Sequence, residues 1–300
     1  MLRPCPGAAG GDCLLSHPQN LPAEQAPLPR SLFGYDVLDR LGEGAASVIY
    51  LVSAPRTSQV YALKHVVRKT DKDDRFIQQL ENEFEVSKLF KHPALRRSVD
   101  LKFNRTFLRR VIDAGLVMEM IDGVPLDQQM PRDLRQALDY FIQAARALAA
   151  LHYLGYVHCD FKPHNIMVMD AGLVKLVDFG QTARVGTAKP RVQGTPDFIA
   201  PEQVKCKPVS EQTDVYSFGA SLYWVITGQR VPTLFTTRKD QRDLLTDQKY
   251  PSPRDLRPDT PIDLSNLVMD CMRMNPLRRP GTMNEVQLRL ESVLRAMPQP

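Results

Sequence analysis

The chain has 300 residues with 43% hydrophobic content, which fits a globular protein of one or two domains and excludes a fibrous or wholly disordered chain. Its net charge of +5 is spread along the sequence, so it suits an anionic ligand without indicating nucleic acid binding. No apolar run approaches the roughly 20 residues of a membrane-spanning helix, and the N-terminus lacks the apolar segment of a signal peptide.

The cysteines indicate a reducing environment. They are odd in number, lie far apart and show no metal-ligand spacing, so they predict neither a disulfide framework nor a zinc site. The five are Cys5, Cys13, Cys159, Cys206 and Cys271. A soluble cytoplasmic protein is the expectation.

The N-terminal segment, residues 1–32, differs in composition from the rest. It is rich in proline and glycine and has no apolar periodicity, which is typical of a disordered tail. The folded domain is therefore expected to cover residues 33–298.

The first part of this domain has the pattern of a β-sheet with one helix. Between Tyr35 and Val66, short β-branched runs alternate with turn residues and predict three antiparallel strands. From Asp71 to Leu89, apolar residues at helical spacing predict one amphipathic helix, which His92-Pro93 ends. The stretch from Arg96 to Met120 predicts two more strands.

The second part has a helical pattern. An apolar stripe at spacings of three and four residues predicts a long helix that ends before Gly155. The stripe consists of Leu134, Leu138, Phe141, Ile142, Ala145 and Leu148. Near the C-terminus, Thr282 and Glu285 form a capping-box pattern ahead of a last amphipathic helix. The sequence thus predicts a small β lobe, residues 33–121, and a larger helical lobe, residues 122–298.

A glycine-rich stretch, "LGEGAASVIY", lies at the first predicted strand turn. Gly42, Gly44 and the small Ser47 let backbone N–H groups approach phosphate oxygens. An ordinary glycine hairpin is the alternative for this stretch taken alone.

Lys64 follows in "YALK", where the apolar neighbours predict partial burial. A buried lysine needs an anionic partner. Glu83 on the predicted helix is the candidate, with Glu81 and Glu85 as competitors on other faces.

A cluster of polar residues, "HCDFKPHN", follows the long helix. In it Asp160 can accept a hydroxyl proton, Lys162 can neutralise a transferred anion, and Asn165 can offer an oxygen to a hard cation. The stretch "LVDFG" adds a second carboxylate, Asp178, at the end of an apolar strand. Together with a glycine-rich loop, these groups are what magnesium bound to a polyphosphate requires.

In this order, the glycine loop, the "YALK" lysine, "HCDFKPHN", "DFG" and "APE" resemble the eukaryotic-type serine/threonine protein kinases, over about residues 33 to 296. The resemblance implies an α+β, two-lobed kinase fold. It has a small five-stranded antiparallel β lobe with one helix, a larger mainly helical lobe, and ATP between them. It also implies protein substrates with Ser or Thr hydroxyls.

The resemblance also assigns catalytic roles. Asp160 is the expected base, Lys162 steadies the γ-phosphate, and Thr195 bridges the two. Lys64 holds the α- and β-phosphates and pairs with Glu83.

Further roles concern metal and nucleotide binding. Asn165 and Asp178 are expected to bind Mg²⁺, with Mn²⁺ as the alternative. Glu119 to Ile121 form the hinge, with Met118 at the gate to the back of the nucleotide pocket. The expected nucleotide-binding residues are Gly42, Gly44, Ser47, Val48, Ala62, Lys64, Met118, Glu119 and Ile121.

Two structural roles complete the set. Asp214 in "TDVYSFG" is expected to hold the backbone of the catalytic loop, and Arg279 to pair with Glu202.

Cys159 replaces the arginine that most of these kinases have before the base, which would place the chain in the non-RD subclass. A thiol cannot grip an activation-loop phosphate. We therefore expect activity without phosphorylation of that loop, or control by a partner. Cys159 itself is either a redox sensor with a lowered pKa or a small inert residue.

Other departures are milder. Ser47 takes the place of the third glycine, and Pro125 lies where a carboxylate usually contacts the ribose, with Asp127 as a possible substitute. Ser87 occupies a position that is usually apolar, which is expected to loosen the helix that carries Glu83.

The segment 96–110 is dense in cations: Arg96, Arg97, Lys102, Arg105, Arg109 and Arg110. It can dock an acidic partner or substrate, or serve as a solvated edge strand.

Two rival functions remain. One is a pseudokinase scaffold that binds nucleotide or partners without phosphoryl transfer, which the complete catalytic set disfavours. The other is a small-molecule phosphotransferase, which "GTPDFIAPE" and the helix that carries Asp214 disfavour.

Overall fold

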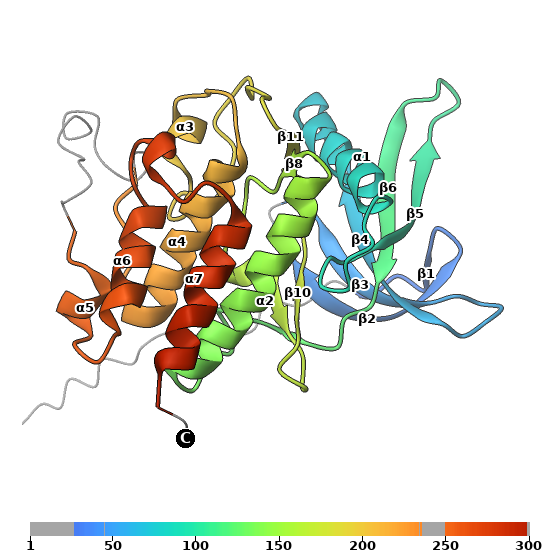
Figure 1. Ribbon diagram of the computed structural model, residues 1–300. Coiled ribbons are helices and arrows are strands. Elements are labelled where there is room, and N and C mark those ends of the chain that lie inside the picture. Colours follow the sequence, from blue (N-terminus) through green and yellow to red (C-terminus); the bar gives the residue numbers. More distant parts are fainter. Residues whose placement is uncertain (1–26, 45, 234, 236–249, 299–300) are drawn as a thin grey trace, which may run out of the picture.

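The computed structural model describes residues 27–44, 46–233, 235 and 250–298. It shows a β-sheet with one helix beside a larger bundle of helices (Figure 1). This is the α+β, two-lobed arrangement that the sequence predicts. No helix within the described ranges is long and apolar enough to cross a membrane.

The sheet of the small lobe has six strands in the order β1-β2-β3-β4-β6-β5, and every neighbouring pair is antiparallel. The strands are β1 (Ser31–Leu32), β2 (Tyr35–Glu43), β3 (Val48–Ser53), β4 (Val60–Val67), β5 (Ser98–Arg105) and β6 (Val111–Glu119). The prediction of five strands was therefore one short. The extra strand, β1, uses the last two residues of the expected tail, whose residues 1–26 lie outside the described ranges.

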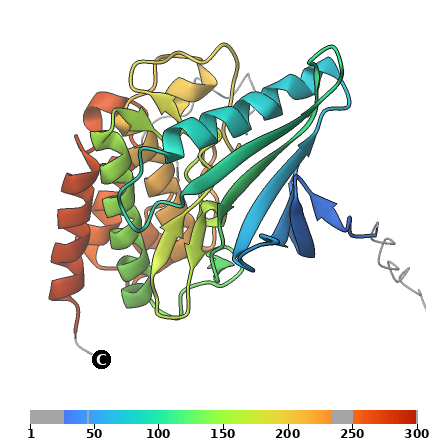
Figure 2. The ribbon, with the colours of Figure 1, turned by 90° about the vertical axis from the view of Figure 1, so that its right-hand side faces the viewer.

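The helix of this lobe, α1, spans Asp74–Ser87 and lies across one face of the sheet (Figure 2). Ile77 and Leu80 are buried in a cluster with side chains of β4 and β6. The prediction of a single helix from Asp71 to Leu89 was too long at both ends. A 3₁₀ turn, Asp71–Asp73, precedes α1, and Leu89 lies beyond it and is exposed.

The large lobe consists mainly of α2 (Leu134–Tyr153), α3 (Pro201–Val204), α4 (Glu211–Thr227), α5 (Pro253–Leu256), α6 (Ile262–Cys271) and α7 (Met283–Ala296). Its short strands are β7 (Val124–Pro125), β8 (Tyr156–Val157), β9 (Ile166–Val168), β10 (Val174–Leu176) and β11 (Ala183–Arg184). Among its described residues the lobe also has the 3₁₀ turns Pro163–Asn165 and Pro276–Arg278.

The predicted helices of this lobe are confirmed. The whole apolar stripe of α2 is buried, and α4, whose side chains are nearly all buried, lies at the centre of the same core. Thr282 caps α7 by accepting from the backbone N–H of Glu285. The Glu285 carboxylate accepts from Gly281 rather than from Thr282, so half of the predicted capping box forms.

Backbone hydrogen bonds join the two lobes beside the site. The N–H of Leu176 donates to Ala94 O at 2.8 Å, and the N–H of Arg96 donates to Leu176 O at 3.1 Å. They fix the segment after α1 to the strand that leads into Asp178.

Candidate active site

Lys64, Glu83 and Asp178 meet between the lobes. The Lys64 Nζ lies 3.0 Å from Glu83 Oε2 and 2.8 Å from Asp178 Oδ1. Burial by itself lowers the pKa of Lys64, but Asp178 and Glu83 outweigh it and raise that pKa above its ordinary value. The positive charge of Lys64 in turn holds the pKa of Asp178 well below its usual range. Both groups are therefore charged at neutral pH.

Glu83 has a second cationic partner, because Arg96 Nη2 lies 2.6 Å from its Oε1. The side chains of Arg96 and Glu83 are 9% and 1% exposed. The expectation that Arg96 belongs to a solvated basic face was wrong. Glu81 is exposed and Glu85 pairs with Lys88, so neither competes for Lys64.

The catalytic-loop carboxylate, Asp160, forms a closed triangle with Lys162 and Thr195. The Thr195 hydroxyl donates to Asp160 Oδ1 at 2.7 Å, while Lys162 Nζ donates to Asp160 Oδ2 at 3.0 Å and to Thr195 Oγ1 at 2.7 Å. Thr195 is thus held against the carboxylate of Asp160, although the two residues are 35 positions apart in the sequence. The arrangement that the resemblance implied for Thr195 is present.

Asp214, at the start of α4, fixes the backbone of this loop. Its two carboxylate oxygens accept from the N–H of His158 at 2.7 Å and of Cys159 at 2.9 Å, and His152 Nε2 lies 2.8 Å away. These bonds support Cys159 at a φ of 65°, a left-handed conformation that is unfavourable for a residue with a side chain. The sequence-based expectation for Asp214 is confirmed.

Cys159 is 1% exposed and packs with Val157, Val209 and Ala183. Burial raises the pKa of its thiol to about 12. The thiol is therefore protonated at neutral pH and screened from solvent, which are poor conditions for oxidation. Of the two interpretations, the redox sensor with a lowered pKa is contradicted and the inert residue is favoured.

Phe179, which follows Asp178, packs against two aromatic rings, edge-on to Phe90 and tilted against His158. Its ring centroid lies 4.6 Å from that of Phe90 and 5.2 Å from that of His158. Ser87 is buried and donates its hydroxyl to Phe84 O at 3.0 Å, so its polar group is satisfied. Phe90, just beyond α1, supplies the apolar contact with Phe179 that Ser87 cannot make.

Asn82 of α1 adds a polar link to the segment after Asp178. Its amide donates to Thr182 O at 2.8 Å and lies 3.3 Å from Gly180 O. The helix that carries Glu83 is thus attached to this segment by more than the ion pair.

The glycine-rich loop joins β2 to β3 in the small lobe. Gly44 N–H donates to Ser47 O at 2.7 Å, and a Cβ on Gly44 would lie only 3.1 Å from Ser47 Oγ. A side chain at Gly44 would therefore require the Ser47 hydroxyl to shift by a few tenths of an ångström. Val48 opens β3 after this turn.

β4 and the end of β6 carry the other predicted nucleotide-binding residues. Ala62 pairs with Met118 across the sheet, and both are buried. Glu119 is ion-paired with Lys175 of β10, and the buried Ile121 follows. The predicted nucleotide-binding residues thus lie on β2, β3, β4 and β6, in the loop between β2 and β3, and just after β6.

Pro125 and Asp127 occupy the region where the sequence predicts the ribose contact. Pro125 lies in β7 and offers no carboxylate, while Asp127 Oδ2 is 3.1 Å from His164 Nδ1 in the catalytic loop. Asp127 is therefore positioned by the catalytic loop.

Beyond Thr195, the "APE" segment is anchored to the helical core. Arg279 and Glu202 form the predicted ion pair, which is buried and bidentate, with N–O distances of 2.8 and 3.0 Å. Gln203 donates to Cys159 O at 2.8 Å and to Gln193 O at 3.1 Å. The activation segment and the catalytic loop are thus joined directly.

Asn165 and Asp178 fit the demands of a hard cation. The Asn165 amide nitrogen donates to Asp160 O at 2.9 Å, which leaves the side-chain carbonyl oxygen of Asn165 as a possible metal ligand. The Asp178 side chain is 40% exposed, so a cation can reach its carboxylate. Within the described ranges, no group of three or more His, Cys, Asp or Glu could hold a metal by itself. Magnesium commonly binds through one or two carboxylates plus substrate phosphates, which agrees with this pair.

Sequence reasoning missed Arg96, Phe90 and Asn82 as parts of the site. Arg96 was grouped with its charged neighbours, and Phe90 follows the end of α1, where helical periodicity gives no information. Asn82 had one usable signal, since it directly precedes Glu83.

Comparison with known proteins places this geometry in a family. Residues 35–289 match the protein kinase domain family, and the chain belongs to it. It is 27% identical to a probable serine/threonine-protein kinase of Clostridium acetobutylicum, over 86% of this chain and 40% of that protein. It is 32% identical to the serine/threonine-protein kinase PknA of Mycobacterium tuberculosis, over 75% of this chain and 53% of that protein. The chain therefore spans about half or less of the length of these curated relatives.

Proposed function

We propose that this protein is a serine/threonine protein kinase that transfers the ATP γ-phosphate to Ser and Thr hydroxyls of proteins. The observation that carries the proposal is that two clusters of charged side chains lie close together between the lobes. One is the Asp160, Lys162 and Thr195 triangle, and the other is the ion-paired set of Lys64, Glu83 and Asp178. The serine/threonine kinases among its relatives support the same substrate class.

In the proposed mechanism the chain supplies positioning and charge. Asp160 accepts the proton of the substrate hydroxyl, and its carboxylate is already oriented by Thr195. Lys162 lies within 3.0 Å of Asp160, so its ammonium neutralises negative charge that develops beside the base. ATP with Mg²⁺, or with Mn²⁺, supplies the phosphoryl group and screens its charge when bound.

The other charged groups would hold the nucleotide. Lys64, kept in place by Glu83, would bind the α- and β-phosphates, and Asn165 and Asp178 would hold the metal. Gly42, Gly44, Ser47 and Val48 cover the phosphates, and Ala62, Met118, Glu119 and Ile121 line the base-binding end.

A pseudokinase scaffold is the alternative. Nothing in the geometry favours it, because Lys64 and Glu83 are paired and Asp160 is oriented. Ser87 and Cys159 are the sequence features that leave this alternative open, and the Ser87 hydroxyl is satisfied by Phe84 O.

Independence from activation-loop phosphorylation is part of the proposal. The activation segment runs from Asp178 to Glu202. Within it Lys189 Nζ donates to Gln181 O, and Ala188 forms an isolated antiparallel β-bridge with Pro208. Thr182 is 4% exposed, so in this conformation a kinase cannot reach it, whereas Thr187 is exposed. The segment is thus held without a phosphate.

A phosphotransfer assay tests the function. Wild type, Asp160→Asn and Lys64→Met would be incubated with labelled ATP, magnesium and a generic basic protein, with nucleotide binding measured in parallel. We expect incorporation only by wild type, with nucleotide binding retained in Asp160→Asn. Equal incorporation by all three proteins contradicts the kinase assignment, and nucleotide binding without incorporation by wild type supports the scaffold.

Alanine substitution of the two threonines tests the regulation. We expect Thr182→Ala/Thr187→Ala to keep wild-type activity, because Cys159 offers no cation to a loop phosphate. Loss of activity with an unchanged unfolding temperature contradicts this.

The expected cellular setting is the cytoplasm. Cys159, Cys206 and Cys271 are free thiols, which is typical of proteins in a reducing compartment that also holds ATP. An acidic partner that docks on the basic segment 96–110 would contact the exposed cations of that segment but not Arg96, whose side chain is buried.

A further inference from the structure

The hairpin between β5 and β6 carries two exposed apolar side chains at its tip. Phe107 is 101% exposed and Leu108 is 80% exposed. Phe107 is the most exposed large apolar side chain of the described ranges. Full exposure of two adjacent large apolar groups is unfavourable in water, and contiguous apolar surface of this kind marks interaction sites.

The tip is a fixed turn. Thr106 N–H donates to Arg110 O at 2.8 Å, and Arg109 N–H donates to Thr106 O at 2.9 Å. Arg109 takes a left-handed φ of 62°, which closes the turn tightly. Phe107 and Leu108 are therefore held at the apex.

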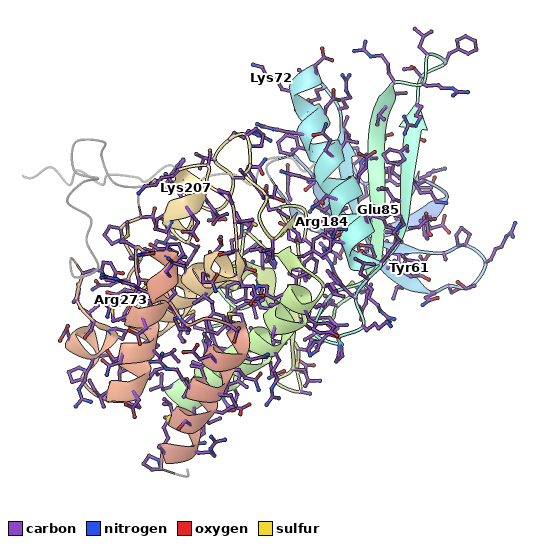
Figure 3. All side chains as sticks on the ribbon, turned by 45° about the horizontal axis from the view of Figure 1, so that its top comes forward. Tyr61, Lys72, Glu85, Arg184, Lys207 and Arg273 are labelled. Carbon is purple, nitrogen blue, oxygen red and sulfur yellow. The ribbon has the colours of Figure 1, made fainter. Side chains whose placement is uncertain are left out.

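Cations surround the apolar apex. Arg105, Arg109 and Arg110 are exposed, and no carboxylate occurs between Arg105 and Arg110. Arg110 lies 3.2 Å from Asp71, which places the 3₁₀ turn before α1 beside the hairpin. Figure 3 shows that Lys72, in the turn before α1, projects from the same end of the sheet as the hairpin.

The acidic groups at this end are already engaged. Asp71 and Asp74 pair with Arg68, and Asp73 accepts from the backbone N–H of Thr70. These carboxylates remain partly exposed, but they are outnumbered by the neighbouring cations, so the surface around the two apolar side chains is net positive. The cations are Arg68, Lys72, Arg105, Arg109 and Arg110.

We infer that this hairpin docks the kinase on a membrane surface that contains anionic lipids, with Phe107 and Leu108 entering the interface and the arginines contacting headgroups. The hairpin is convex, so it fits a deformable interface better than a preformed protein pocket. Apolar side chains that enter the headgroup boundary, combined with cations at headgroup level, are the usual elements of such binding. The hairpin that joins β5 to β6 projects from the small lobe on the side away from the helical lobe (Figure 1).

Vesicle sedimentation of the full chain tests the inference. The probes are vesicles of phosphatidylcholine alone and of phosphatidylcholine mixed with phosphatidylserine. The variants are Phe107→Ser/Leu108→Ser and Arg105→Gln/Arg109→Gln. Leu277→Ser is the matched control, because Leu277 is 92% exposed on the 3₁₀ turn of the other lobe.

We expect wild type and Leu277→Ser to sediment with the anionic vesicles only, and added salt to weaken the binding. Each hairpin variant should bind about tenfold more weakly or worse, with kinase activity and unfolding temperature unchanged. Failure of wild type to bind overturns the inference, as does equal binding by Phe107→Ser/Leu108→Ser. Capture of wild type on a polyglutamate resin, without vesicle binding, would show instead that the surface serves an acidic protein.

Discussion

The buried pair of Arg96 and Glu83 gives the sharpest test of the site. Replacing Arg96 with methionine keeps most of its aliphatic volume and removes one of the two cations on Glu83. Arg97→Met is the matched control, because Arg97 is the next residue, carries the same charge and is exposed.

The loss of unfolding free energy in Arg96→Met depends on which partner Glu83 still has. Removing one partner of a buried ion pair costs about 3–5 kcal/mol when the other charge is left alone. Glu83 keeps Lys64 at 3.0 Å, so the loss is closer to one hydrogen bond between charged groups, about 1.5–3 kcal/mol. For a protein of this size, that lowers the unfolding temperature by roughly 3 to 12 °C.

Two measurements check this. Trp224, the single tryptophan, lies in α4 and reports urea unfolding by fluorescence. We also expect kcat/KM to fall about tenfold, since α1 loses an anchor that fixes Glu83 against Lys64. The double variant Arg96→Met/Glu83→Gln should show non-additive losses. Equal stability of Arg96→Met and Arg97→Met, within about 0.5 kcal/mol, would refute the reasoning.

The remaining predictions concern Phe90, Asp214 and Cys159. Phe90→Ala should lose about 3–5 kcal/mol of unfolding free energy and much of the activity, whereas Phe90→Leu should retain both in large part, and equal stability of the two would contradict the packing argument. Burial alone raises the pKa of Asp214, but hydrogen bonds from His152 and the loop backbone lower it below its ordinary 3.8. The stability that Asp214 contributes is therefore fully present above about pH 4 and is lost as the pH falls through its lower folded pKa, so the stability gap between wild type and Asp214→Asn should narrow on acidification. A constant gap down to the acid transition would count against this. Cys159→Ala should leave activity and peroxide sensitivity unchanged, and iodoacetamide should not label Cys159 in the native protein at neutral pH; labelling there would contradict the burial.

The elements predicted best were those with a long, regular pattern. The stripe of α2 spans several turns, so its period and its end before Gly155 could be predicted. The limits of α1 could not, because Asp71–Asp73 form a 3₁₀ turn whose local pattern also suits a helix. β1 has only two residues, too few to show alternation.

The site residues that could be predicted were those whose chemistry is visible in a local motif. Asp160, Lys162 and Asn165 stand within six positions, and Asp178 precedes a phenylalanine and a glycine. Arg96 belongs to no such motif. Its role depends on the path of the chain after α1, which brings it back beneath Glu83.

The anchors of α1 bear directly on how this kinase can be switched. Glu83 is held by a buried ion pair with Arg96, and Asn82 is bonded to the segment after Asp178. Phe90 packs on Phe179 at the end of the same helix. A regulator that moved α1 out of place would have to break all three contacts and expose a buried carboxylate, which costs several kcal/mol. The activation segment is likewise closed by its own bonds, so we expect control to act through access to the cleft and location of the protein rather than through displacement of α1.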